Sequence, residues 1–108
     1  MIADLDAKVI DISRRHLQAV HHGALDDPRV DIRIGDGMKY VLEDAPAAGD
    51  SYDIVVLDLT DPVGPAEALY SEAFFRACRE LLTPGGALSL HIGTPVFQPE
   101  RVRLLIER

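Results

Sequence analysis

Basic residues, cysteine and long apolar runs are all scarce in this chain of 108 residues. Lysine and arginine number 11 against 18 aspartates and glutamates, which gives a formal net charge of −7 at pH 7. Nucleic-acid binding and attachment to anionic membranes both need clustered positive charge, so we expect neither here. A cationic partner suits the charge of this chain better.

The single cysteine, Cys78, excludes an internal disulfide framework. No stretch approaches the roughly 20 apolar residues that span a bilayer. The first six residues, Met-Ile-Ala-Asp-Leu-Asp, carry charge by the fourth position and lack the basic start of a signal peptide. These features predict a cytoplasmic protein, and the length predicts one globular domain at most.

Short apolar runs alternate with longer amphipathic runs along the whole chain, which is typical of βα units around a parallel sheet. We expect four such units. The four predicted strands cover residues 2–5, 30–34, 52–57 and 87–92. The four predicted helices cover about residues 6–20, 38–43, 66–82 and 99–108.

Several local features follow from these patterns. Residues 52–57 are apolar without alternation, so this strand is predicted to be covered on both faces. Residues 44–51 predict a loop, and the Thr-Pro-Gly-Gly sequence at 83–86 predicts the end of the third helix. That helix carries one apolar stripe, which comprises Tyr70, Phe74, Ala77 or Cys78, and Leu81. Cys78 is therefore expected in the core.

Five acidic residues fall at the ends of the first three predicted strands. They are Asp4, Asp6, Asp36, Asp58 and Asp61. Ligands of open α/β sheets bind outside the carboxyl ends of the strands, so these positions mark the expected site. A carboxylate cluster repels itself unless something positive fills it. The sequence therefore predicts a cationic small-molecule ligand.

Three of these aspartates also have purely structural interpretations. Asp6 suits a helix N-cap, Asp36 between two glycines suits a turn, and Asp61 precedes a proline as turn residues often do. Asp4 and Asp58 directly end apolar strands and are the stronger candidates for a site.

Histidine offers one further candidate. His91 lies near the end of the fourth predicted strand, where the binding crevice is expected. The other histidines have no metal-ligand spacing and are expected to be surface or half-buried helix residues. They are His16, His21 and His22.

The segment at 58–66, Asp-Leu-Thr-Asp-Pro-Val-Gly-Pro-Ala, resembles the signature of the spermidine synthase (polyamine aminopropyltransferase) family. Further motifs of this family occur in the right order over essentially the whole chain. They are Asp4-x-Asp6, Asp26-Asp27-Pro28-Arg29-Val30, Gly35-Asp36-Gly37, Leu69-Tyr70 with Phe74, and Pro84-Gly85-Gly86.

This resemblance implies an α/β fold with a class I methyltransferase-like (Rossmann-like), mostly parallel sheet and flanking helices. It also implies polyamine biosynthesis, in which an aminopropyl group passes from decarboxylated S-adenosylmethionine to a diamine such as putrescine and yields spermidine and methylthioadenosine. Decarboxylated S-adenosylmethionine is then a co-substrate, and no resident cofactor or metal is expected. A homo-oligomer is expected as well.

By resemblance, three residues bind the nucleoside. Asp4 holds the ribose hydroxyls, at a position where the family more often has Glu, and Asp36 contacts the adenine amino group from the segment that includes Gly37.

Three other residues are assigned to the amine by the same resemblance. Asp58 positions and deprotonates the attacking amine, while Asp61 and His91 bind the amine substrate. Many members of the family have Gln where this chain has His91, so the acceptor need not be putrescine. Leu59 also departs from the small polar residue that is more common there.

One unit of the family has no counterpart in this chain, namely the glycine-rich strand-loop-helix unit that precedes Asp4. In the strand order 3-2-1-4-5 the missing first strand is central. The strands that end at Asp4 and Asp58 should then pair directly, leave backbone groups unpaired, or borrow a strand from another chain. Because the family's C-terminal strands also lack a counterpart, residues 1–108 are predicted to be a partial catalytic domain that is inactive alone.

Two other functions stay open on the residues alone. An S-adenosylmethionine-dependent methyltransferase would share the sheet, Asp4 and Asp36 but would not need a loop with two carboxylates. A non-catalytic fragment that binds nucleosides or associates with itself is the other alternative.

Overall fold

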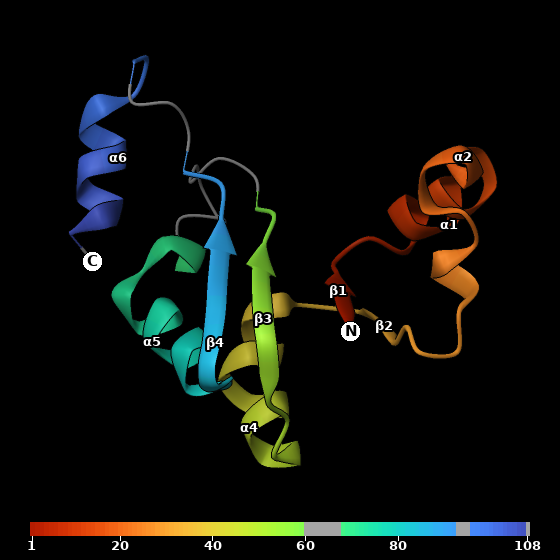
Figure 1. Cartoon of the computed structure of the whole chain (residues 1–108), viewed down its shortest axis with the longest axis horizontal. Coiled ribbons are helices and arrows are strands. Elements are labelled where there is room, and N and C mark those ends of the chain that lie inside the picture. Colours follow the sequence, from red (N-terminus) through yellow and green to blue (C-terminus); the bar gives the residue numbers. More distant parts are fainter. Residues whose placement is uncertain (60–67, 93–95, 108) are drawn as a thin grey trace. The chain divides into compact units, whose positions relative to one another are not determined.

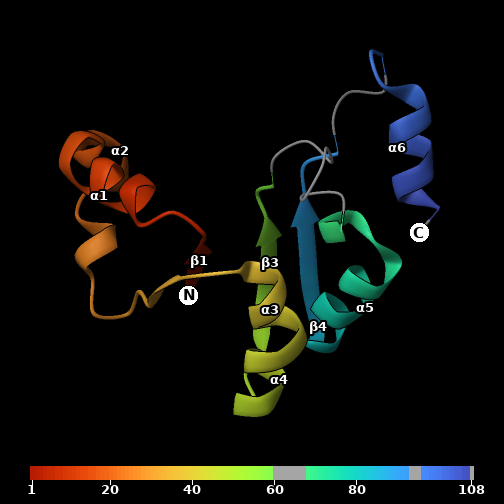
Figure 2. The same cartoon turned by 180° about the vertical axis from the view of Figure 1, so that it is seen from behind.

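The computed structural model describes residues 1–59, 68–92 and 96–107. The chain divides into two compact units, Met1–Tyr40 and Val41–Arg108. Each unit has one sheet of two parallel strands, as the ribbon views show (Figures 1 and 2). Parallel strands with helices between them confirm the expected α/β class.

The first unit pairs β1 with β2 in parallel, with Asp4 opposite Ile34. Its elements are, in order, β1 (Ile2–Asp4), α1 (Ala7–His16), α2 (Gln18–His21), the 3-10 helix η1 (Ala24–Asp26), β2 (Ile32–Ile34) and α3 (Gly37–Lys39). A single helix over 6–20 was predicted, and the structure instead divides this segment at Leu17.

The ends of the first helical segment follow from local chemistry. The Asp6 carboxylate caps α1 by accepting a hydrogen bond from the Lys8 backbone N–H at 2.8 Å, which confirms the N-cap prediction. At the other end His22 has a φ of 47° and Gly23 a φ of 84°. Two left-handed residues in succession cannot continue a right-handed helix, so the chain turns there.

The second unit contains the longer strands and the larger helices. Its elements are, in order, the π-helical turn η2 (Tyr40–Asp44), which begins on the last residue of the first unit, α4 (Ala45–Ala48), β3 (Tyr52–Leu57), α5 (Glu72–Glu80), β4 (Leu82–Leu90) and α6 (Pro99–Ile106). The bounds of β3 match the predicted strand, and α6 begins at Pro99 as expected.

The loop predicted over 44–51 is wrong in its first half, because helical backbone continues through α4. Pro46 occupies the first turn of α4, where a missing N–H costs nothing, and Ala45 is fully buried. Gly49, with a φ of 72°, ends the helix instead. A proline that sequence patterns treat as a breaker is thus accommodated at a helix start.

Helix α5 begins later than predicted. Ser71 caps it by accepting a hydrogen bond from the Phe74 N–H at 3.2 Å, and residues 66 and 67 of the predicted helix lie outside the described residues. The predicted apolar stripe is confirmed, because each of its larger members is buried. These are Tyr70, Phe74, Cys78 and Leu81.

Strand β4 also differs from its prediction, because it begins at Leu82 and ends at Leu90. Tyr52 lies opposite Leu82 but Ile54 lies opposite Ala87, so the Thr-Pro-Gly-Gly segment forms a bulge inside the strand. A Cβ on Gly86 would lie 3.0 Å from the Asp53 carbonyl oxygen. Glycine is required there by this close approach of the two strands.

Within the described residues of the second unit, strand β3 is covered on one face only, contrary to the prediction. Helices α4 and α5 lie on the same face of the sheet (Figures 1 and 2). On the other face the side chains of Ile54 and Val56 are 65% and 66% exposed. Since successive side chains alternate between faces, only one half of this apolar strand is buried.

Each strand pairs with a strand of its own unit. Within residues 1–59, 68–92 and 96–107, β1 pairs with β2 only and β3 with β4 only. The outcome expected for the strands that lead to Asp4 and Asp58 stays a prediction, because these strands belong to different units.

Candidate functional site

Two strands of the second unit bring Asp58 and His91 to the same sheet edge. Leu57 and Leu90 are opposite each other in the parallel register, and Asp58 and His91 are the next residues on the two chains. Buried Leu57 and half-buried Leu90 anchor the strand ends, whereas both polar residues are exposed. The strand register thus places an aspartate and a histidine directly after two neighbouring strand ends.

The first unit brings Asp4 and Asp36 to the carboxyl edge of its own sheet. The Gly35 N–H donates to the Asp4 carbonyl oxygen at 2.8 Å, which extends the strand pairing to the point where both chains leave the sheet. Asp36 follows directly, and Gly37 is the first residue of α3. Half-buried Asp4 and exposed Asp36 therefore end neighbouring parallel strands.

Both carboxylates of this first group are oriented by backbone donors. Asp4 Oδ1 accepts from the Asp6 N–H at 2.8 Å, and Asp36 Oδ1 accepts from the Met38 N–H at 2.8 Å. Asp36 is thus the N-cap of α3, a structural role more specific than the turn former suggested by its flanking glycines. One oxygen of each carboxylate is therefore held by a local backbone hydrogen bond.

The predicted site residues therefore fall into two groups. Asp4, Asp36 and Gly37 belong to the first unit, and Asp58 and His91 belong to the second. The sixth, Asp61, lies outside the described residues.

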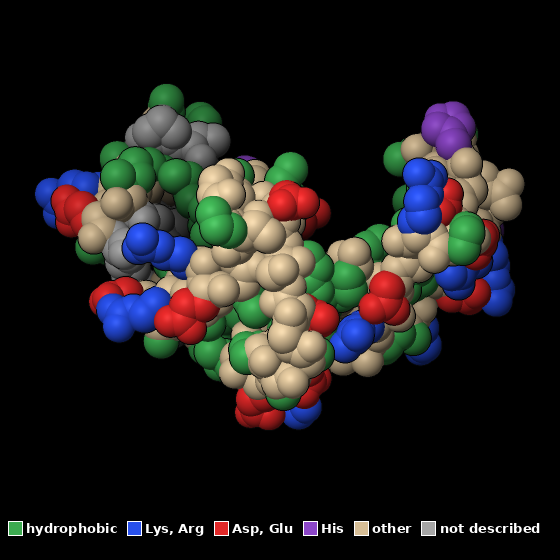
Figure 3. All heavy atoms as spheres, turned by 60° about the horizontal axis from the view of Figure 1, so that its bottom comes forward, with side chains coloured by type: hydrophobic (Ala, Val, Ile, Leu, Met, Phe, Trp, Pro, Cys, Tyr) green, Lys and Arg blue, Asp and Glu red, His purple; other side chains and the backbone are tan. Residues whose placement is uncertain are grey.

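The predicted site carboxylates have no basic partner in the described part of the chain. Arginines of both units bind carboxylates elsewhere, for example Arg14 to Asp26 at 2.7 Å and Arg76 to Glu72 at 2.7 Å. In the space-filling view, acidic and basic side chains are intermixed over the visible face (Figure 3).

The other histidines and the cysteine take structural roles, as expected. His16 and His22 are exposed, and half-buried His21 accepts a hydrogen bond from the Gly23 N–H at its Nδ1 at 3.0 Å. Burial raises the pKa of the Cys78 thiol to about 11. Cys78 therefore stays protonated near neutral pH and is not a nucleophile.

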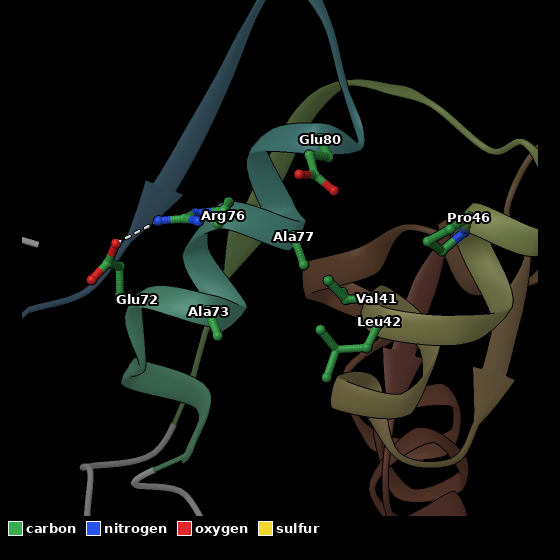
Figure 4. Close-up of a pocket in the computed structure, with 8 residues that line it drawn as sticks. All are labelled: Val41, Leu42, Pro46, Glu72, Ala73, Arg76, Ala77 and Glu80. Atoms are coloured by element: carbon green, nitrogen blue, oxygen red, sulfur yellow. Dashed lines mark hydrogen bonds and ion pairs between the residues drawn. The ribbon is translucent and has the colours of Figure 1, made fainter.

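A shallow groove with a volume of about 620 Å³ lies between helices of the second unit. Val41 and Leu42 face Ala73 and Ala77 across it, and the ion pair of Arg76 lies at one side (Figure 4). Sequence reasoning missed this groove, although small residues four apart on α5 are the signal for it. Its walls are helical side chains, so it is separate from the strand edges.

Comparison with known proteins decides the family. Residues 1–107 match the model of the spermine/spermidine synthase domain. The chain belongs to this family. This match confirms the family resemblance seen in the sequence and the methyltransferase-like fold class that it implies.

Curated relatives of the spermine/spermidine synthase family match nearly all of this chain. It is 47% identical to the polyamine aminopropyltransferase of Nitrosomonas europaea over 106 residues. These residues are 97% of this chain and 31% of the relative. It is 39% identical to polyamine aminopropyltransferase 1 of Pseudomonas aeruginosa, over 99% of this chain and 36% of the relative. The chain thus spans about a third of the length of these relatives, which agrees with the expected correspondence to part of a larger fold.

A relative from a distant organism shows the same pattern. The polyamine aminopropyltransferase of Pyrobaculum neutrophilum is 41% identical over 108 residues, which are 98% of this chain and 37% of the relative.

Among the described residues, no helix is both long and apolar enough to cross a bilayer.

Proposed function

We propose that this chain supplies the nucleoside-binding and amine-activating residues of a polyamine aminopropyltransferase. Membership of the spermine/spermidine synthase family carries the proposal, and the two polar strand edges support it. In this proposal residues 1–108 are part of a Rossmann-like catalytic domain. The wider protein is a cytoplasmic homo-oligomer whose partners are small cationic substrates.

The first unit binds the nucleoside of decarboxylated S-adenosylmethionine in this proposal. Asp4 accepts hydrogen bonds from the ribose hydroxyls, and Asp36 accepts one from the adenine amino group beside Gly37. The local hydrogen bonds at 2.8 Å support these roles, because they hold each carboxylate in place before the ligand arrives. The co-substrate supplies the sulfonium leaving group and the aminopropyl chain.

The second unit activates the acceptor amine. Alkyl amines titrate near pH ~10, as lysine does, and carry no free lone pair when protonated. The Asp58 carboxylate orients the amine and takes up its proton. The nitrogen then bonds to the propyl carbon as the bond from that carbon to sulfur breaks, and the sulfonium becomes the neutral thioether of methylthioadenosine. Positioning the two reactants in line supplies much of the rate increase.

The remaining ammonium group of the diamine needs further acceptors. Asp61 and His91 are assigned to it, Asp61 as a second carboxylate and His91 as an imidazole at the end of the strand next to that of Asp58. Exposure of Asp58 and His91 at one edge supports a site that a flexible diamine can enter from solvent.

The test is a chimera in which this chain replaces the matched 106 residues of the Nitrosomonas europaea relative. Incubation with decarboxylated S-adenosylmethionine and putrescine should yield methylthioadenosine and spermidine in equal amounts, measured by mass spectrometry. Parallel incubation with S-adenosylmethionine is the control for a methyltransferase. A folded chimera that forms neither product, or that only methylates, contradicts the proposed function.

A further inference from the structure

The groove between η2 and α5 has an apolar floor that is open to solvent. Val41 and Leu42 face Ala73 and Ala77 across it, and Leu42 is 45% exposed (Figure 4). A shallow groove encloses little of a small molecule, whereas small-molecule sites bury most of their ligand. Alanines instead let a second helix approach closely, to about 8 Å between helix axes. The shape of the groove therefore suits a helix as its occupant.

The charged residues along α5 have a self-complementary order. Glu72 lies in the first turn of the helix, whereas Arg76 and Arg79 follow it, Arg79 in the last turn. Parallel packing of two copies of α5 would place like charges at the same height. Antiparallel packing instead brings the acidic start of each helix beside the basic part of the other, and it also opposes the two helix dipoles. The charge pattern of α5 thus favours a second, antiparallel copy of α5.

The heights of the residues along the two helices agree with this arrangement. When Ala73 of one copy lies opposite Ala77 of the other, the rise of 1.5 Å per residue fixes every other pair. Glu72 then falls between Arg76 and Arg79 of the second copy, within about 3 Å of each along the helix axis. A two-fold axis repeats the same contacts in the opposite direction.

We propose that the groove is the interface of a symmetric dimer, in which α5 of each copy lies antiparallel in the groove of the other. Leu42 of each copy then packs on the alanines of its neighbour and is covered. The inference rests on the homo-oligomer of the proposed function and names its contact surface. A helix of nine residues buries less than the roughly 1,200–2,000 Å² of stable complexes, so the dimer forms reversibly and increases with concentration.

The ion pair within α5 is compatible with this contact. Arg76 Nη2 donates to Glu72 Oε1 at 2.7 Å, and the two side chains are 68% and 66% exposed. A carboxylate accepts several hydrogen bonds and a guanidinium donates several, so each group can bind a second partner. The pair therefore holds both side chains at the edge of the groove, where a second copy meets them.

The first test measures the oligomeric state of this chain by analytical ultracentrifugation over a wide range of concentrations. The wild-type chain should pass from monomer to dimer, whereas Leu42→Asp should stay monomeric because the contact would bury its charge. Ile106→Asp is the matched control, because Ile106 is 72% exposed on α6, outside the groove, and this variant should dimerise as the wild type does. A monomeric wild-type chain, or equal dimerisation of the two variants, overturns the proposal.

The second test asks whether the charges of α5 meet between copies. Glu72→Arg alone and Arg76→Glu alone should each lose the dimer, because the contact then opposes like charges. An equal mixture of the two variants should form a heterodimer, since the arginines of one chain face the glutamates of the other. Changes within one helix cannot explain this rescue, because each chain keeps its own pair of like charges.

Native mass spectrometry identifies the heterodimer, because the two variants differ in mass, and circular dichroism shows that each variant is folded. Single variants that dimerise as the wild type does, or a mixture that stays monomeric where the wild type dimerises, overturn the proposal.

The outcomes also separate this inference from aminopropyl transfer. A chain that stays monomeric, while the chimera forms methylthioadenosine and spermidine, overturns the interface alone. A folded chimera that transfers nothing counts against the proposed activity, whereas a heterodimer of the two charge variants still supports the interface.

Discussion

The two units differ in how much apolar side chain each of them buries. Among the described residues, the first unit buries only Ile10 and Tyr40. The second buries a larger set in η2, α4, β3, α5 and the residues that flank α5, which comprises Val41, Ala45, Leu57, Tyr70, Phe74, Cys78 and Leu81. Burial of apolar surface is the main favourable term in folding. The sheet edge with Asp58 therefore belongs to the unit that apolar burial stabilises more, and the edge with Asp4 to the unit that it stabilises less.

The first unit relies on local polar contacts instead. Large apolar side chains such as Leu5 and Val20 are exposed there, while Asp6 caps α1 and Arg14 binds Asp26. Exposed ion pairs contribute only about 0–1 kcal/mol. The comparison teaches that local hydrogen bonds orient the carboxylates of Asp4 and Asp36, whereas a small hydrophobic core supports the strand that leads to Asp58.

The largest expected effect comes from Phe74, which is 2% exposed. Phe74→Ala should destabilise the second unit by about 3–5 kcal/mol, because it removes a buried ring and leaves a cavity. Amide exchange should then accelerate in β3 and β4 but not in β1 and β2. Phe75→Ala, at a half-buried neighbour, is the control and should cost less. Equal acceleration in both sheets would break the comparison.

A smaller effect is expected from alkaline pH, again in the second unit. Burial raises the pKa of Cys78 to about 11, whereas a thiol in an unfolded chain titrates near ~8.5. Between these values the unfolded chain binds fewer protons than the folded one, so stability falls as pH rises. This contribution is fully present below pH ~8.5 and is lost through about pH 11.

Urea unfolding at several pH values measures this effect. The stability of the wild-type chain should fall between neutral pH and pH ~10 more than that of Cys78→Ala, which has no thiol to ionise. Identical slopes for the two proteins would show that burial of the thiol does not contribute.

The smallest effect is expected in the first unit. Asp6→Ala removes the N-cap of α1 and should cost about 1 kcal/mol of helix stability. Asp6→Asn is the matched control, because asparagine also accepts the capping hydrogen bond. Circular dichroism during thermal unfolding reports the difference. A loss with Asn as large as that with Ala would mean that charge, rather than capping, holds this helix.

Local structure could be predicted from the sequence where residues that are adjacent along the chain determine it. The bounds of β3 and the cap at Asp6 depend on adjacent residues only. The bulge in β4 was missed because it depends on how Gly86 meets the carbonyl of Asp53 on another strand. Coverage of β3 was misjudged because an apolar strand cannot specify which elements lie against it.

The candidate site divides in the same way. That Asp58 and His91 reach one sheet edge follows from parallel strands whose apolar ends are legible in the sequence. The N-cap role of Asp36 was hidden because its flanking glycines suggested only a turn. The orientation of the Asp4 and Asp36 carboxylates depends on backbone hydrogen bonds that only the folded chain defines.

The central claim is that Asp58 accepts the proton of the attacking amine, and single-turnover kinetics of the chimera test it most directly. Asp58→Asn keeps the shape of the side chain but removes its basicity, so the rate of aminopropyl transfer should fall by about 10²–10⁴. Asp53→Asn, which makes the same change elsewhere on β3 and can still accept the Thr83 hydrogen bond, should leave the rate unchanged. A near wild-type rate in Asp58→Asn would contradict the account.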